Sequence, residues 1–118
     1  MDKFIPEEEI IEMNYREMVE WVESNKIFEP SLIDLIKRQV ERPTLEGNFP
    51  YDSHEFNGIP LPDDPQTAFN VGHDYGVIKT AIFAKIRKTG KMSEKQIFTL
   101  KHFVFLGVLS KYENEKDL

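Results

Sequence analysis

The segment PQTAFNVGHDYGVIKTAIFAKIRKT, residues 65–89, decides the fold that this sequence predicts. Apolar side chains recur along it at spacings of three and four residues, which is the pattern of a helix face that packs into a core. This first face comprises Ala68, Val71, Tyr75, Ile78, Ile82 and Ile86. About 100° further round the helix lies a second face of small or mostly apolar residues, namely Phe69, Gly72, Gly76, Thr80 and Phe83. The polar side chains are confined to a narrow strip that contains Asn70, Asp74, Lys85 and Lys88.

The ends of this helix are marked by residues with strong positional preferences. Asp63 and Asp64 supply an acidic cap, and Pro65 suits the first helical position because the N–H that it lacks is not needed there. Gly90 directly follows Thr89, where a glycine commonly ends a helix. We therefore predict a helix over residues 65–89.

A second strongly apolar helix is predicted over residues 93–112. Ser93 and Gln96 have the spacing of a capping box, and the apolar residues that follow spread around the whole helix. The short link to the preceding helix predicts an antiparallel αα-hairpin. The run from His102 to Leu109 is also compatible with a buried strand, because periodicity does not separate the two. The capping box and the length favour the helix.

Two amphipathic helices are expected before this hairpin. The first covers residues 7–25, and the second covers residues 31–42 and ends before Pro43, which disfavours a helical residue ahead of it. Residues 43–64 read as a long proline-rich loop, and residues 113–118 as a frayed tail. The predicted fold is mostly α: one domain over residues 1–118, arranged like a four-helix bundle.

The wide apolar surface of residues 65–89 and 93–112 also predicts self-association. A helix that is apolar all round is a buried helix, and two amphipathic helices with a loop offer little surface to cover two of them. We therefore expect a homodimer. The residues expected at helix packing or at the interface are Gly72, Gly76, Phe83, Phe103 and Leu106.

Composition narrows the function classes. The formal net charge of -6 argues against a nucleic-acid partner, and the absence of cysteine excludes thiolate metal sites and cysteine nucleophiles. No stretch is long and apolar enough for a membrane span, and the first residues lack the pattern of a signal peptide. A cytoplasmic protein without a membrane partner is expected.

One alternative is a metal-dependent enzyme. His54 and Glu55 in the loop, with His73 and Asp74 in the third helix, supply ligand types suited to a divalent metal. A histidine followed later by a His-Asp pair resembles the helical, metal-dependent HD phosphohydrolases, and the resemblance covers His54, His73 and Asp74. The later aspartate of that family has no clear counterpart in this sequence.

Two further patterns could involve phosphate. The run from Glu8 to Glu12 is similar to the first half of the magnesium-binding carboxylate pattern of MazG-like nucleotide pyrophosphohydrolases, and the second half is absent. Arg87, Lys88 and Lys91 surround the turn at Gly90 and could bind the phosphates of a small nucleotide ligand.

The leading prediction is a small interaction protein without enzymatic activity or cofactor, which acts as a regulator, inhibitor or adaptor by binding a protein partner. The common nucleophile and phosphate-loop motifs of enzymes are absent from the sequence. Loops on rigid scaffolds often carry binding, and the central loop is rich in apolar side chains. The predicted partner-binding residues are Phe49, Tyr51, Phe56 and Ile59.

Overall fold

The computed structural model describes residues 7–41 and 63–116. Helices make up most of these residues, and no strand occurs among them. In chain order the helices are α1 (Glu7–Glu12), α2 (Tyr15–Asn25), α3 (Pro30–Glu41), α4 (Pro65–Thr89) and α5 (Glu94–Lys116). The mostly α, bundle-like fold predicted from the sequence is confirmed, and the run from His102 to Leu109 is helical.

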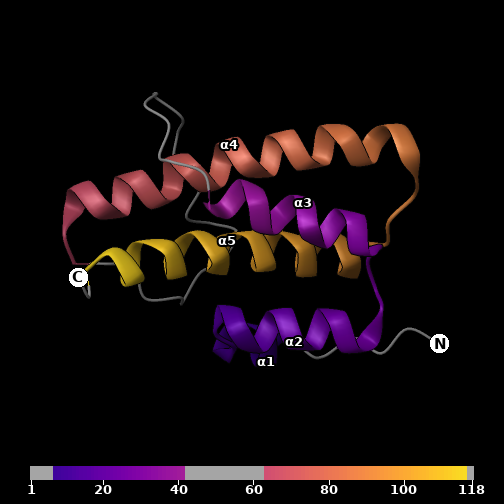
Figure 1. The fold of residues 1–118 in the computed structure, drawn as a ribbon, viewed down its shortest axis with the longest axis horizontal. Coiled ribbons are helices and arrows are strands. Elements are labelled where there is room, and N and C mark those ends of the chain that lie inside the picture. Colours follow the sequence, from indigo (N-terminus) through magenta and orange to yellow (C-terminus); the bar gives the residue numbers. More distant parts are fainter. Residues whose placement is uncertain (1–6, 42–62, 117–118) are drawn as a thin grey trace.

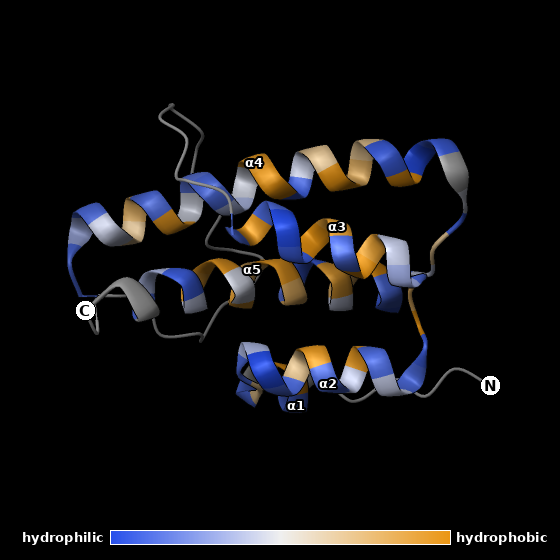
Figure 2. Ribbon diagram, in the orientation of Figure 1, coloured by the Kyte–Doolittle hydropathy of each residue, from blue (hydrophilic) through white to orange (hydrophobic). Residues whose placement is uncertain are grey.

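Helix α5 lies at the centre of the bundle. In Figure 1 it passes behind α3, with α4 on one side and α1 and α2 on the other, and it packs against all four of these helices. Every residue from His102 to Leu109 is buried. Figure 2 shows why, because the middle of α5 is apolar on successive turns whereas α2 alternates between polar and apolar residues. The prediction that an all-round apolar helix is a buried one holds for α5.

The amphipathic helices α2 and α3 cover α5 with their apolar faces. Met18 and Val22 of α2 are buried, as are Ile33, Ile36 and Val40 of α3. The helices are also joined at their surface, where Lys37 Nζ lies 2.6 Å from Glu23 Oε1. This pair is partly exposed to water, so burial of the apolar faces supplies most of the stabilisation.

The predicted helix over residues 7–25 is wrong in one respect, because the chain forms two helices there. Asn14 lies between them and caps α2: its Oδ1 accepts a hydrogen bond from the backbone N–H of Glu17 at 2.8 Å, and the Glu17 carboxylate accepts one from the backbone N–H of Asn14. Asparagine bonds its own backbone readily, and this competes with a continuous helix. At the other end of the chain, α5 continues to Lys116, into the predicted frayed tail.

Helix α5 lies close to α2 and α3 at Gly107. A Cβ atom built on Gly107 would lie 2.9 Å from Val40 Cγ2 and 3.0 Å from Tyr15 Cε1. Valine is branched at Cβ and has little freedom to move away. Tyr15 is also fixed by an edge-to-face contact with Phe103, with ring centroids 5.5 Å apart. Glycine therefore allows this three-helix contact, which the sequence analysis did not identify.

Replacing Gly107 with alanine should destabilise the protein. The added methyl group is overpacked against Val40 and Tyr15, at a typical cost of about 1 to 3 kcal/mol, and the helix propensity of alanine offsets roughly 1 kcal/mol of this. Thermal and urea unfolding would measure the difference. Gly90→Ala is the matched control, because a Cβ at Gly90 has no atom within 4 Å and its φ of -179° is extended. Equal stability of the two variants would contradict the close approach.

The length and hydropathy of each helix also show whether it could cross a membrane. No helix in residues 7–41 or 63–116 combines the length and the apolar character needed to cross a bilayer.

Candidate functional site

Several residues predicted to form a site lie outside the described residues. These are the partner-binding residues Phe49, Tyr51, Phe56 and Ile59 and the potential metal ligands His54 and Glu55. The metal-site alternative, which combines His54 and Glu55 with His73 and Asp74, therefore stays a prediction. The candidates that the structure describes lie on α4, α5 and the turn between them.

Asp74 is not in an exposed polar strip, contrary to the sequence prediction. It is 5% exposed and His73 is 3% exposed. Their side chains also meet, because His73 Nδ1 lies 3.3 Å from Asp74 Oδ1 although neighbouring residues diverge around a helix. A charged residue in a mostly apolar helix is expected at the surface, which is why the sequence predicts an exposed Asp74. The sequence of α4 does not show that α5 supplies partners for this carboxylate in the interior.

The partners of Asp74 come from the far end of α5. The Tyr112 hydroxyl donates a hydrogen bond to Asp74 Oδ2 at 2.7 Å, and Lys111 Nζ lies 3.8 Å from the same oxygen. Both carboxylate oxygens are thus engaged by side chains of the protein. No group of three or more potential metal ligands occurs among the described residues. The arrangement joins α4 to α5 in the interior, where a buried carboxylate requires such partners.

Removing the Tyr112 hydroxyl should destabilise the protein. Tyr112→Phe keeps the ring but leaves Asp74 Oδ2 without its shortest hydrogen bond, and hydrogen bonds to charged groups contribute about 1.5 to 3 kcal/mol. Urea unfolding would measure the loss. In an Asp74→Asn background the same change should cost less, since the acceptor is then neutral. Tyr15→Phe serves as the control, because the Tyr15 hydroxyl makes no hydrogen bond within the described parts of the chain. A similar loss in both tyrosine variants would contradict this role.

His102 is a second buried polar residue, which the sequence analysis placed only within an apolar run. Its side chain is 0% exposed and stacks on Phe98, with ring centroids 6.2 Å apart. Burial lowers the pKa of His102 from 6.5 to about 4, and hydrogen bonding to the backbone of Ile10 acts in the opposite direction. The imidazole is therefore neutral near pH 7, and it contributes to packing between α1 and α5.

The shifted pKa of His102 predicts a loss of stability in acid. Between pH 6.5 and about pH 4 the unfolded chain binds a proton at His102 that the folded protein does not, so stability falls as the pH is lowered through this range. The shift corresponds to roughly 3 kcal/mol. His102→Gln should lack this part of the pH dependence. Urea unfolding at several pH values would test this, and parallel profiles for the two proteins would contradict it.

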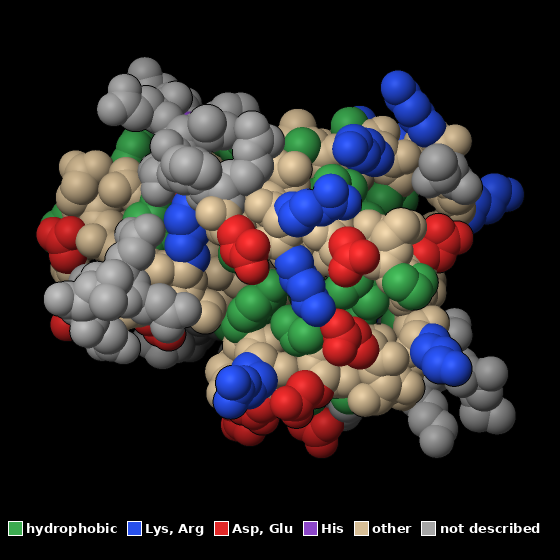
Figure 3. Space-filling view, in the orientation of Figure 1, with side chains coloured by type: hydrophobic (Ala, Val, Ile, Leu, Met, Phe, Trp, Pro, Cys, Tyr) green, Lys and Arg blue, Asp and Glu red, His purple; other side chains and the backbone are tan. Residues whose placement is uncertain are grey.

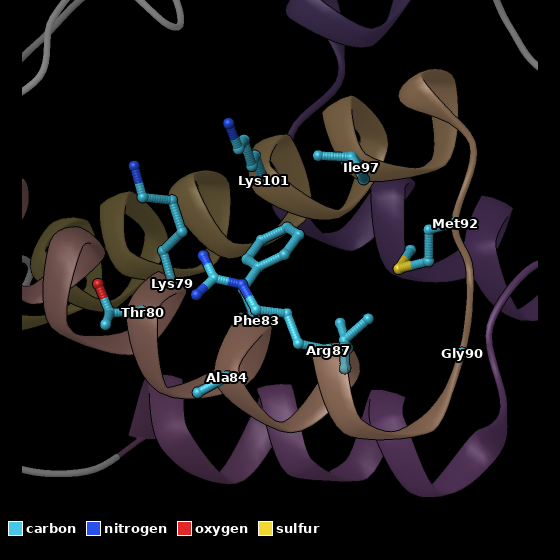
Figure 4. A pocket seen from close by; sticks show the side chains of 10 residues that line it. Lys79, Thr80, Phe83, Ala84, Arg87, Gly90, Met92, Ile97 and Lys101 are labelled. Atoms are coloured by element: carbon cyan, nitrogen blue, oxygen red, sulfur yellow. The ribbon is translucent and has the colours of Figure 1, made fainter.

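A groove between α4 and α5 is the strongest candidate for a binding site. Its volume is about 470 Å³. Figure 4 shows the Phe83 ring pointing from α4 into the groove, with Ile97 and Lys101 of α5 across from it. Met92, from the turn, closes the end near Gly90. The side chains of Phe83, Met92 and Ile97 are all partly exposed, so the floor of the groove presents apolar surface to solvent.

The rim of this groove is positively charged. Lys79 and Arg87 of α4 and Lys101 of α5 line it, and within residues 7–41 and 63–116 no carboxylate does. In Figure 3 several Lys and Arg side chains project around the right-hand end of the molecule, where α4 and α5 meet, with some acidic side chains between them. Acidic side chains also gather over α1 and α2 below. The chain as a whole has a formal net charge of -6, whereas the charged residues that line this groove, among those described, are cationic.

A second groove lies on the other side of the α4–α5 turn and has a volume of about 530 Å³. It shares Ile86, Gly90 and Met92 with the first groove. Its other apolar residues come from the start and middle of α3 and the segment before it, and the charged residues that line it are Arg38, Lys85, Lys91 and Glu29. The two grooves thus form neighbouring parts of one apolar and mainly basic surface.

The structure distributes the predicted phosphate-binding residues around this surface. Arg87 lines the first groove and Lys91 the second, and Lys88 is exposed but lines neither. Among the predicted packing residues, Phe83 lies in the first groove, whereas Phe103 and Leu106 belong to the core. Gly72 is buried and Gly76 is partly buried. The contribution of Met92 and Ile97 was missed, because no sequence pattern shows which apolar residues stay partly exposed.

Comparison of the chain with protein-family models, curated proteins and solved structures found no match.

Proposed function

We propose that the protein is an interaction protein without enzymatic activity, a regulator, inhibitor or adaptor, and that it binds a protein partner at the groove between α4 and α5. One observation carries the proposal: partly exposed apolar side chains, Phe83, Met92 and Ile97, lie beneath a rim of cationic residues. A protein interface has this composition, with apolar anchors at its centre and charges at its edge.

The apolar floor of the groove is costly to leave in contact with water. Burying apolar area gains roughly 25 cal/mol per Å², and the folded chain leaves part of that gain unused around Phe83. The charged rim affects mainly the rate and the specificity of association. A partner that covers the floor therefore gains free energy from apolar burial, and one whose charges complement the rim also associates faster and more specifically.

Site-specific crosslinking would test this proposal. A photoreactive phenylalanine analogue placed at Phe83 should crosslink to a protein of defined mass in cells that produce both partners. Phe69 is the matched control position, since it is a phenylalanine on the same helix, does not line either groove and is 44% exposed. The yield of the crosslink from position 83 should decrease on Arg87→Glu, because the rim charge that speeds association is reversed. No protein adduct, or equal adducts from both positions, would contradict the proposal.

A second candidate function is supported by three cations, Lys79, Arg87 and Lys101, which line the same groove as the Phe83 ring. A small phosphorylated ligand such as a nucleotide could stack its base on Phe83 and bind the cations through its phosphates. The groove volume of about 470 Å³ lies in the range of small-molecule sites. The metal-dependent phosphohydrolase alternative has no such support, since it needs His54 and Glu55 as well as His73 and Asp74.

The homodimer also remains a prediction. It is predicted because one chain offers little surface to cover two helices that are apolar all round. The middle of α5 is buried within a single chain, so α5 needs no second copy to cover it, and only α4 still supports the prediction. Helix α4 still presents Phe69 as an exposed large apolar side chain, so α4 is the helix through which a second copy would associate.

A further inference from the structure

We propose that the occupant of the α4–α5 groove is an acidic amphipathic helix of the partner protein, with apolar side chains on Phe83, Met92 and Ile97 and carboxylates at Lys79, Arg87 and Lys101. This inference rests on the proposed function and specifies the chemistry of the partner segment.

The sign of the charge comes from the lining residues of both grooves. Among the described residues that line them, the charged ones are Lys79, Arg87 and Lys101 in the first groove and Arg38, Lys85, Lys91 and Glu29 in the second. This cationic surface lies on a chain with a formal net charge of -6. A basic segment is repelled by the cations of this surface and attracted to the acidic residues elsewhere on the protein, whereas an acidic segment is attracted to this surface.

The need for an apolar face comes from the floor. Phe83, Met92 and Ile97 stay partly exposed between the cations, and the shared residues Ile86 and Met92 continue this surface into the second groove. A polyphosphate could neutralise the rim but has no apolar group to cover the floor, and a nucleotide or nucleic acid has only the faces of its bases. Side chains such as leucine or phenylalanine on one face of a segment would do so.

The helical form follows from the walls of the groove. Both long walls are helices, α4 and α5, whose backbone groups bond within the helix, and the described residues offer no strand edge beside it. An extended peptide would therefore find no backbone ladder to join. A helix satisfies its own backbone hydrogen bonds and presents apolar residues at i, i+3, i+4 and i+7.

Defined peptides would test the inference on the intact protein. The probe is an amphipathic helix of about 15 residues, with leucines on one face and glutamates on the other. Its controls are a scrambled peptide of the same composition, a version with lysine in place of glutamate, and the nucleotide ATP. Fluorescence anisotropy would give affinities, and amide chemical shifts from NMR would locate the binding. We expect binding of the acidic amphipathic peptide alone, with the largest shifts at residues 79–101.

Matched variants separate the charge from the apolar term. Arg87→Glu and Lys91→Glu should each lower the affinity for the acidic peptide by at least about fivefold. They should also lower its association rate, because a rim charge acts mainly on association. Arg16→Glu makes the same change in charge on an exposed face of α2 and should leave the affinity unchanged. Phe83→Ala should weaken binding whereas Phe69→Ala should not. Folding of each variant is checked by its urea midpoint.

The outcomes distinguish this inference from the function on which it rests. Equal binding of the scrambled peptide, preference for the lysine peptide, or shifts outside residues 79–101 would overturn the acidic helix. If ATP binds and the acidic peptide does not, the ligand of the groove is a phosphorylated small molecule and the acidic helix is overturned. If no peptide binds while position 83 still crosslinks to a protein, the inference fails and the proposed function stands. If position 83 also yields no protein adduct, both fail.

Discussion

The rest of the structure depends on the burial of α5. Its central turns carry apolar residues in every direction, so no single face can be left to water. The chain meets this requirement by placing α4 along one side and α1, α2 and α3 around the others. Because the covering helices need only one apolar face each, their outer faces remain polar and can carry the acidic charge of the protein.

This arrangement explains the unusual residues inside the core. Four helices around a fifth need close approaches, and Gly107 provides one where Val40 and Tyr15 meet α5. Polar groups enclosed by the same packing must find partners there. Asp74 does so through the Tyr112 hydroxyl, and His102 remains neutral because burial lowers its pKa. The interior is therefore specified by a few polar and small residues as well as by apolar area.

Sequence reasoning identified the features of this fold that depend on local chemistry. Helical repeats, the proline before α4 and the Ser93–Gln96 capping box indicated where the C-terminal helices lie, and the wheel of α5 indicated that it is buried. The break at Asn14 was missed although asparagine is a common cap, because the apolar repeat continues across it. The burial of Asp74 could not be read from the sequence, since its Tyr112 partner lies 38 residues away along the chain. The groove could be predicted only in part. Its cations cluster in the sequence, but its apolar floor depends on which apolar residues remain partly exposed after the helices pack.

Native-state hydrogen exchange tests the central claim, that one chain covers α5 by itself. The account predicts that amides from His102 to Leu109 exchange most slowly, through global unfolding, and that their protection is the same at low and high micromolar protein concentration. Amides of α1 and of the ends of α3 should exchange faster. Protection of α5 that decreases on dilution would contradict the account, because a second copy would then be covering the helix. Exchange in α5 as fast as in α1 would contradict it as well.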